Sequence, residues 1–527
     1  MSEFKLRTES IKDDDIISLA VKNENDERII RSLISSEPCL LEGSRGTGKS
    51  FLMKIAQLNI EKSDTNSLSI FISFNISSLI NTGDSLQFYH WMLAKTLRAL
   101  INKLRKSGLS ISDYTKSLIS NDTSENQETI ENNLKTIVKL FEDSYNQRPS
   151  TIDVNSLPDI EDVKEAIKEI CKENSLDRIY FFFDEAAHVF RPEQQRQFFN
   201  LFKDLRSPYI TCNAAIYPGV THFGDSFEPI HDCIYEVLDR NIADDDYLEY
   251  FKTIVFKQAD EGLKNEIDRQ RELFNTLVLS CGGNPRILLK TIQEMPKLNT
   301  QEVNKIIKDF YRVKIWSEHT ELGEKYKGHQ ILIDWGRDFL EKTVIPQMLN
   351  NEKSSIYFWI NKDIPEAIKE SLRLLTYTGI IKKIDAGVRS HGELGVRYEV
   401  KYGCIIALVS NPHTYSMELS KIRSLKQFTA FGKNLSEYDK IQNLSASILE
   451  DEKYKESLES MLTKSIDVLS LTEWQKNRLK SAQIFTIRDL YGLNENDLIE
   501  KIYSVGPIRA RIMMNAANSE LLEYISG

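Results

Sequence analysis

Residues 43–50 of this 527-residue chain read Gly43-Ser44-Arg45-Gly46-Thr47-Gly48-Lys49-Ser50. The spacing G-x-x-x-x-G-K-[ST] is that of a phosphate-binding loop. Its glycines let backbone N–H groups curl around a β-phosphate, and the helix that follows favours anions at its N-terminus. The context agrees, because an apolar strand is expected at residues 38–42 and a helix from Ser50 to about residue 61. All eight residues of the loop are therefore predicted to bind the phosphates of a nucleotide.

Two residues of this loop and two later carboxylates are predicted to carry the chemistry. Lys49 would place a point charge on the β- and γ-phosphates, and Ser50 would offer its hydroxyl to Mg²⁺. The run Tyr180-Phe181-Phe182-Phe183-Asp184-Glu185 is typical of a buried central strand that ends in two acids. Ligands lie at this carboxyl edge of open α/β sheets, so Asp184 is expected to hold Mg²⁺ and Glu185 to orient and deprotonate the attacking water. The absence of an N-K-x-D guanine motif favours ATP over GTP.

A third motif, Cys281-Gly282-Gly283-Asn284-Pro285-Arg286, lies in a helical region after the last predicted strand. Gly-Asn-Pro makes a turn, which places Arg286 at or near the first residue of a helix over 287–294. An arginine fixed there can reach a γ-phosphate. Arg286 therefore joins Glu185 and Lys49 as a candidate catalytic residue.

The order of elements predicts a doubly wound parallel sheet with a helical lid, that is, an α/β P-loop ATPase core. We place the core at residues 1–243, with a helical insertion at about 107–158, and the lid at 244–330. The acidic residues 1–25 are expected to form a partly ordered lead-in. Five strands are expected, at residues 38–42, 68–74, 179–183, 209–217 and 233–238.

These three motifs resemble those of the AAA+ ATPases, over roughly residues 20–300. The nearest resemblance is to the clade that contains replication initiators of the origin-recognition type and the STAND signalling ATPases. Those families share the P-loop, an Asp–Glu pair often followed by Ala and His, as in Asp184-Glu185-Ala186-Ala187-His188, and a G-N-P-R lid turn. The resemblance implies ATP and Mg²⁺ as cofactors and assembly into a homo-oligomer.

The chain departs from the family at two positions. The family places a polar sensor at the end of the strand after the Asp–Glu strand, where this chain has Tyr217, while Asn213 lies in mid-strand and is expected to satisfy a neighbouring backbone group. The first sensor is therefore left unassigned. The family also supplies an arginine finger after that strand, but residues 211–232 contain no Arg or Lys. Arg206 is the nearest substitute, although a plain helix C-terminal cation is the simpler interpretation.

Residues 331–412 are expected to form a winged-helix domain, a type that replication initiators carry at this place. Helices are predicted at 331–349 and 363–377, with Asp363 as a candidate N-cap, and strands at 379–384 and 396–400 flank a loop that contains Gly387, Gly392 and Gly395. The region holds 11 basic and 10 acidic residues, so DNA contact and protein packing both remain open. The residues that could meet DNA phosphates are Arg373, Lys382, Lys383, Arg389 and Arg397.

Residues 466–527, after a helical linker at 413–465, resemble helix–hairpin–helix domains. A hairpin at Ser504-Val505-Gly506-Pro507 leads into the last helix, whose N-terminus could present N–H groups to a phosphate. Arg509 and Arg511 would add positive charge. Basic and acidic residues balance at seven each over 471–527, so DNA backbone contact and protein docking are both retained as hypotheses.

Composition narrows the class of protein. The net charge of −10 excludes a uniformly basic coat, and the six cysteines contain no C-x-x-C pair. The first residues show no apolar signal region and no run is long enough to span a membrane, so a cytoplasmic protein is expected. We therefore hypothesise an ATPase that engages DNA. The alternative is a STAND-like, ATP-gated oligomerising switch, for example in anti-phage defence, that acts through an effector protein.

Overall fold

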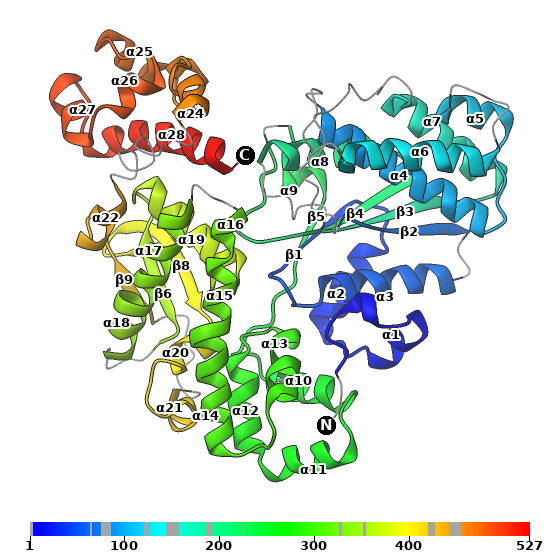
Figure 1. Ribbon diagram of the computed structural model, residues 1–527, viewed down its shortest axis with the longest axis horizontal. Helices are drawn as coiled ribbons and strands as arrows, with labels where there is room; N and C mark the ends of the chain where they lie inside the picture. Colours follow the sequence, from blue (N-terminus) through cyan, green and yellow to red (C-terminus); the bar gives the residue numbers. More distant parts are fainter. Residues whose placement is uncertain are drawn as a thin grey trace.

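A five-stranded parallel sheet forms the centre of the N-terminal half (Figure 1). The computed structural model describes residues 4–63, 66–74, 86–120, 126–143, 157–185, 192–224, 226–325, 329–350, 355–419, 427–442 and 455–526. The strand order is β2-β3-β4-β1-β5, and every neighbouring pair is parallel. This arrangement confirms the α/β P-loop fold class. The strands are β1 (Cys39–Glu42), β2 (Ser67–Ser73), β3 (Arg178–Asp184), β4 (Ile210–Ile216) and β5 (Ile234–Val237).

Strand β3 is apolar throughout because both of its faces are covered. Phe181 and Phe183 pack into the apolar cluster on one face of the sheet, whereas Tyr180 and Phe182 pack into the cluster on the other. The alternation follows from the two-residue period of a strand. Figure 1 shows helices on both faces of the sheet. On one side lie α1 (Asp13–Leu19), α2 (Glu24–Leu33) and α3 (Lys49–Lys62), and on the other α4 (Gln87–Lys106), α7 (Ile160–Glu173) and α8 (Pro192–Asp204).

The predicted insertion contributes two described helices, α5 (Asp113–Ile119) and α6 (Gln127–Asp143). Helix α6 packs along α4, where Glu131 accepts hydrogen bonds from Asn102 and Arg105. This part of the insertion is therefore an added layer on the core. Residues 121–125 and 144–156 of the predicted insertion lie outside the described residues.

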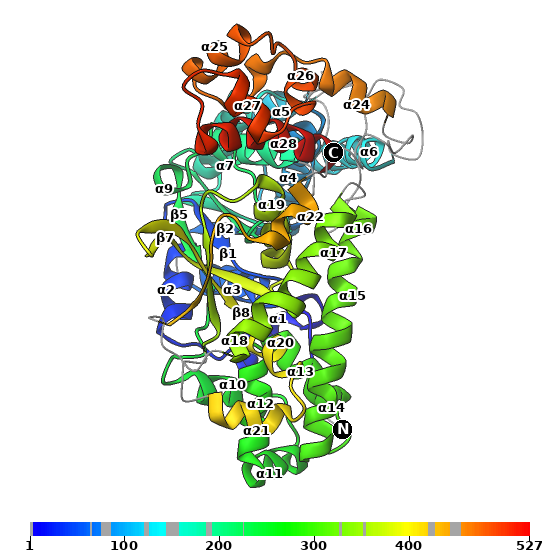
Figure 2. The same cartoon turned by 90° about the vertical axis from the view of Figure 1, so that its left-hand side faces the viewer.

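The lid follows β5 as a set of short helices. A long helical column, formed by α14, a π-helical turn and α15, leads away from it (Figure 2). Asn284 caps α13 by accepting a hydrogen bond from the N–H of Ile287 at 3.2 Å. Phe310–Lys314 is a π-helical turn within the column. The helices are α10 (Tyr247–Phe256), α11 (Glu261–Arg269), α12 (Arg271–Ser280), α13 (Pro285–Glu294), α14 (Thr300–Asp309), α15 (Ile315–Thr320) and α16 (Leu322–Lys325).

A second, four-stranded sheet of order β7-β8-β6-β9 forms the winged-helix region. Its β7–β8 hairpin is longer than expected, because the strands run through the predicted loop to a turn at His391 and Gly392, both with positive φ. Gly395 lies within β8, where a Cβ atom would come 2.3 Å from the Trp359 ring. This glycine therefore serves a close approach and not a loop. The elements are α17 (Gln330–Phe339), α18 (Ile345–Asn350), β6 (Tyr357–Asn361), α19 (Glu366–Tyr377), β7 (Ile381–Ser390), β8 (Glu393–Val400), α20 (Tyr402–Ile406), α21 (Pro412–Leu419) and β9 (Thr429–Phe431).

Two local expectations for this region are wrong. Helix α19 begins at Glu366 after Pro365, so Asp363 is not its N-cap. The residue before a proline is driven to an extended conformation, which delays the helix to the far side of Pro365. Strand β6 was not expected, because all five of its residues are buried and the periodicity of a short apolar run does not distinguish a buried strand from a buried helix.

The C-terminal module consists of short helices whose starts are capped by side chains. Thr472, Thr486 and Asn494 each form a capping box. The last helix lies against α19, as Figures 1 and 2 show, and one apolar cluster runs from the lid through the winged-helix region into this module. The predicted boundaries at residues 243, 330, 412 and 465 stay predictions. The helices are α24 (Lys455–Leu462), α25 (Glu473–Ser481), α26 (Ile487–Tyr491), α27 (Glu495–Lys501) and α28 (Pro507–Ser526).

A buried ion pair of the core is linked to the lid through Tyr250. Arg240, which follows β5, donates to the Asp26 carboxylate of α2 at 2.9 Å and to the Thr47 carbonyl of the P-loop at 2.7 Å. Tyr250 of α10 donates to the other oxygen of Asp26 at 2.6 Å, and its ring lies beneath the Arg240 guanidinium. Both charged side chains are less than 10% exposed, so each depends on the other for compensation. Across the described part of the chain, no helix is both long and apolar enough to cross a membrane.

The first prediction concerns this ion pair. Asp26→Ala would leave the buried Arg240 without a counter-charge, which typically lowers the free energy of unfolding by about 3–5 kcal/mol. Glu27→Ala, at an exposed position of the same helix, should change it by less than about 0.5 kcal/mol. Calorimetric unfolding of both variants checks this. Equal melting temperatures would show that the ion pair does not stabilise the junction.

Candidate functional site

The P-loop connects the end of β1 to the start of α3 and forms an open cradle. Gly46 and Gly48 have φ values of 88° and 105°, which side chains rarely adopt. No atom lies within 4 Å of the position that a Cβ of Gly48 would occupy. The lid holds the loop from one side, because Asn284 donates to the Arg45 carbonyl at 2.7 Å. The predicted Gly-Asn-Pro turn thus touches the phosphate loop directly.

Lys49 lies at the floor of this cradle. Its ammonium donates to the carbonyls of Gly43 at 2.5 Å and Ser44 at 3.2 Å, and it lies 4.0 Å from the centroid of the Tyr217 ring. Burial lowers the pKa of Lys49 to about 7. A negatively charged phosphate beside it would reverse this shift, since an opposite charge favours the ammonium form. The site therefore fits an anionic group.

The two predicted carboxylates lie at the end of β3, next to α3. Burial raises the pKa of Asp184, although a hydrogen bond from Ser50 and the charge of Lys49 act in the opposite direction. A buried carboxylate beside a hydroxyl fits a divalent cation, which would supply the missing positive charge. Glu185 donates its own N–H to Asp184 at 3.1 Å and has a φ of 59°. Such strained backbone is frequent at active sites. Residues 186–191, which include the Ala and His of the motif, lie outside the described residues.

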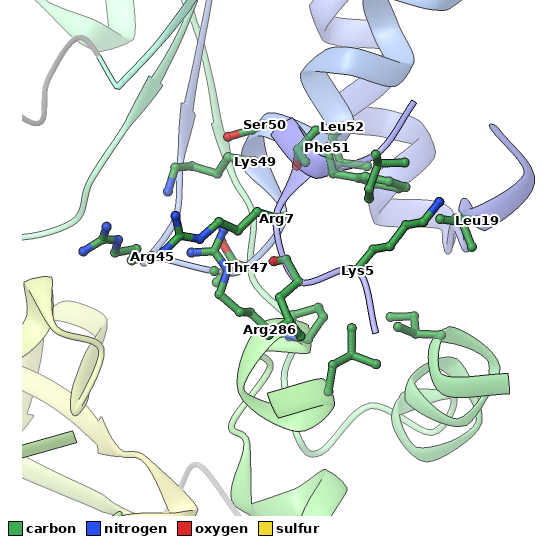
Figure 3. A pocket seen from close by; sticks show the side chains of 18 of the residues that line it. Lys5, Arg7, Leu19, Arg45, Thr47, Lys49, Ser50, Phe51, Leu52 and Arg286 are labelled. Carbon is green, nitrogen blue, oxygen red and sulfur yellow. Dashed lines mark hydrogen bonds between the residues drawn. The ribbon is translucent and has the colours of Figure 1, made fainter. Parts of the chain in front are cut away.

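Four cations gather around one end of the pocket. Arg286 is the second residue of α13, and its Nε donates to the Leu6 carbonyl at 3.1 Å. Burial, and then the charge of Arg45, lower the pKa of Arg286. Figure 3 shows Arg7, Arg45, Lys49 and Arg286 on the same side of the pocket. So dense a positive charge suits a polyphosphate.

The N-terminal segment, which sequence reasoning missed, lines the pocket from the cationic end, where Arg7 lies, to the other end. Phe4 is buried in the lid cluster, and the five residues Lys5 to Glu9 line the pocket together with Ile11. Figure 3 shows Lys5 and Leu19 at the other end, away from the four cations, and apart from Lys5 that end is largely apolar. The signal that could have revealed the segment is the apolar and basic run Phe4-Lys5-Leu6-Arg7 within an acidic stretch. The other apolar lining residues include Leu19, Val21, Phe51, Leu52, Ile254 and Leu289.

The structure also shows the surroundings of Asn213, Tyr217 and Arg206, which were considered for the family's sensor and arginine-finger positions. The Asn213 side chain donates to the Leu33 carbonyl at 3.0 Å, so it satisfies a neighbouring backbone group as expected. Tyr217 lies between Lys49 and the winged-helix region, where its ring meets Tyr377 edge-on at 5.8 Å. Arg206 does not line the pocket and lies within 4 Å of two carboxylates, Glu37 and Asp232.

The winged-helix region rests on the rim of this site. A Cβ at Gly379 would lie 3.3 Å from the Ser44 side chain, and one at Gly219 would lie 2.6 Å from the Arg373 carbonyl. A wide cavity remains beside this contact, lined by the P-loop, β5 and the β7–β8 hairpin. The P-loop thus has direct contact with the winged helix.

Most cations that were expected to meet DNA are engaged within the protein. Arg373 donates to Glu370, Lys382 to Asp239 of the core, and Arg397 to Asp385. Arg511 forms an ion pair with Glu495 and donates to the Asp363 carbonyl at 2.9 Å, so it fastens the last helix to the winged helix. Those that remain exposed and form no ion pair within 4 Å in the described residues are Lys383, Arg389 and Arg509.

Comparison with known proteins identifies a family and similar solved structures. The sequence model of the ORC-CDC6-like family matches residues 5–338. A structure of the Orc1 protein of Aeropyrum pernix in complex with DNA is 11% identical, with 76% of this chain and 98% of that chain covered at a TM-score of 0.31. A score this low does not establish a common arrangement of domains. No curated protein matches the chain in sequence.

The second prediction concerns the N-terminal wall. Arg7→Ala should weaken nucleotide binding by roughly two- to fivefold, because it removes one partly exposed charge from the cationic end. Lys49→Ala should abolish binding, since it removes the charge at the floor. Arg31→Ala, at an exposed position of α2, should leave the affinity unchanged. Calorimetric titration with ATP measures all three, and equal affinities for Arg7→Ala and Arg31→Ala would remove the segment from the site.

Proposed function

Because the chain belongs to the ORC-CDC6-like family of AAA+ proteins, we propose that it binds and hydrolyses ATP and couples its nucleotide state to DNA binding or partner recruitment. The observation that carries the proposal is the contact between the P-loop and the winged helix. Ser44 meets Gly379, and Tyr217 lies between Lys49 and Tyr377. A movement of the P-loop or of Tyr217 when the bound nucleotide changes would therefore displace residues of the winged helix.

The two ends of the pocket match the two halves of ATP. The backbone of residues 43–48, Lys49 and Arg286 would hold the phosphates, and the apolar end formed with the N-terminal segment would take the base. Ser50 and Asp184 would hold Mg²⁺, which supplies charge neutralisation at the phosphates when it is bound. ATP is the substrate: the oxygen of water would bond to the γ-phosphorus while the bond to the β–γ bridging oxygen breaks, which gives ADP and inorganic phosphate.

Glu185 is the proposed general base. It would orient a water molecule and accept its proton at a carboxylate oxygen. Burial, and then the charge of Asp184, raise the pKa of Glu185, which makes the carboxylate a better proton acceptor. Arg286 would bind the γ-phosphate, so that loss of this phosphate would alter the position of the lid. Arg286 is the second residue of α13, next to the contact between Asn284 and the P-loop.

DNA would be held by the cations that the protein leaves exposed. Lys383 and Arg389 lie on β7, the outer strand of the winged-helix sheet. Arg509 lies in the first turn of α28, after the hairpin. Contacts to backbone phosphates from such positions would be largely independent of sequence.

The third prediction tests hydrolysis. Glu185→Gln should retain ATP binding and lose turnover by roughly 10²–10⁴-fold, because an amide cannot accept the proton. In the native protein, activity should fall as the pH drops through the raised pKa of Glu185, at a pH above the usual glutamate value of about 4.3. Phosphate release at several pH values measures both effects. Near-native turnover by the variant would place the base elsewhere.

The fourth prediction tests DNA binding. Lys383→Ala with Arg389→Ala should weaken duplex binding for all sequences and flatten the plot of log affinity against log salt by about two units. Lys342→Ala, which removes an exposed and ion-paired lysine of the same region, should alter neither quantity. Duplex affinity is measured by anisotropy with and without ATP.

The DNA-engaging ATPase and the ATP-gated oligomerising switch predict different results in this assay. Duplex affinity that changes with ATP supports the proposal. Absence of duplex affinity, together with ATP-dependent assembly in mass photometry, would favour the oligomerising switch that acts through an effector. Assembly into a homo-oligomer remains a prediction in either case.

A further inference from the structure

The C-terminal module exposes an indole ring. Trp474, in the first turn of α25, is 39% exposed. The other four tryptophans of the chain are at most 7% exposed and belong to apolar cores: Trp91, Trp316, Trp335 and Trp359. Packing in an apolar core therefore does not explain the exposed ring of Trp474.

Two guanidinium groups from different helices converge on this ring. Arg509 of α28 lies 4.8 Å from the centroid of the ring and Arg478 of α25 lies 5.2 Å from it. Arg509 also donates to the Ser504 carbonyl of the hairpin at 2.6 Å. Tyr503, which precedes Ser504 in the sequence, is 84% exposed. We call Trp474, Arg478, Tyr503 and Arg509 the Trp474 surface.

The charge of this surface is not compensated within the protein. In the module, Arg488 pairs with Glu459 and Arg511 with Glu495. Over the described residues, by contrast, neither Arg478 nor Arg509 reaches a carboxylate. Stacking on the indole orders the two guanidinium groups while leaving their charge available to a ligand.

We propose that the Trp474 surface binds single-stranded nucleic acid. Unpaired bases would stack on the exposed rings and guanidinium planes, and Arg478 and Arg509 would neutralise the phosphates. Exposed aromatic rings favour this class over a duplex, whose bases are stacked inside the helix and present only their edges. Such a site adds unpaired strands to the duplex contacts of the proposed function and does not require the ATP site.

The five tryptophans allow a site-specific experiment on the full-length protein. Because only Trp474 is exposed, quenching of tryptophan fluorescence by a thymidine homo-oligonucleotide would report stacking at this ring. Trp474→Leu should abolish the quenching and weaken binding, measured by anisotropy of a labelled oligonucleotide, by roughly 5- to 100-fold. Trp474→Phe keeps an aromatic ring and should bind within a few-fold of the native protein, which separates stacking from any loss of fold.

The charges are tested in the same assay. Arg478→Gln with Arg509→Gln should weaken binding and flatten its salt dependence by roughly one to one and a half units. Arg488→Gln, which removes an arginine paired with a carboxylate in the same module, is the matched control and should bind like the native protein.

The outcomes separate the two proposals. Quenching that is lost in Trp474→Leu, with weaker binding by the arginine variant, supports the site. Duplex binding without quenching, unchanged by the variants, would overturn the site and remove Arg509 from the duplex contacts, while the duplex contacts of Lys383 and Arg389 in the proposed function would stand. No binding of either nucleic acid would overturn both and indicate that the surface docks a protein. Oligonucleotide binding without duplex binding would support the site alone.

Discussion

The rest of the structure depends on one buried charge, the guanidinium of Arg240. It contacts the Asp26 carboxylate of α2, the Thr47 carbonyl of the P-loop and the ring of Tyr250 in the lid. Because a buried charge without its partner is strongly destabilising, these three elements cannot separate at low cost. The cradle for the phosphates is therefore shaped by the lid and by α2 as much as by the glycines of the loop.

This constraint has a consequence for the modules that follow. The lid, the winged helix and the last helices share one apolar cluster, whereas the sheet packs against two others. The winged helix also meets the P-loop at Ser44 and Gly379. Two routes, one through the lid and one through Tyr217, thus connect the phosphate end of the pocket to the C-terminal half. In the proposed function, both would carry the nucleotide state to the surfaces that contact DNA.

The charge balance of the C-terminal half becomes informative only once ion pairs are known. Basic and acidic residues are nearly equal in number there, so the counts alone predict no strong electrostatic potential at the surface. The structure sorts the cations into two groups, because Lys382 and Arg511 hold modules together while Arg389, Arg478 and Arg509 face no carboxylate in the described residues. Recognition of an anion depends on this local excess and not on the net charge of −10.

The sequence by itself determined the features that depend on neighbours along the chain. The glycine spacing of the P-loop, the apolar run of β3 and the Gly-Asn-Pro turn before α13 follow from local geometry and period. Only the tertiary structure decided that Phe4 to Glu9 close the pocket, that Arg511 is an internal fastening and that the glycines near residue 390 belong to a continuous hairpin. The physical reason is that each of these depends on a partner far away in sequence: Leu6 meets Arg286, Arg511 meets Asp363, and Gly395 makes room for Trp359. Periodicity and motif spacing describe a residue's neighbours in the chain, whereas the folded packing alone determines which distant groups share a buried contact.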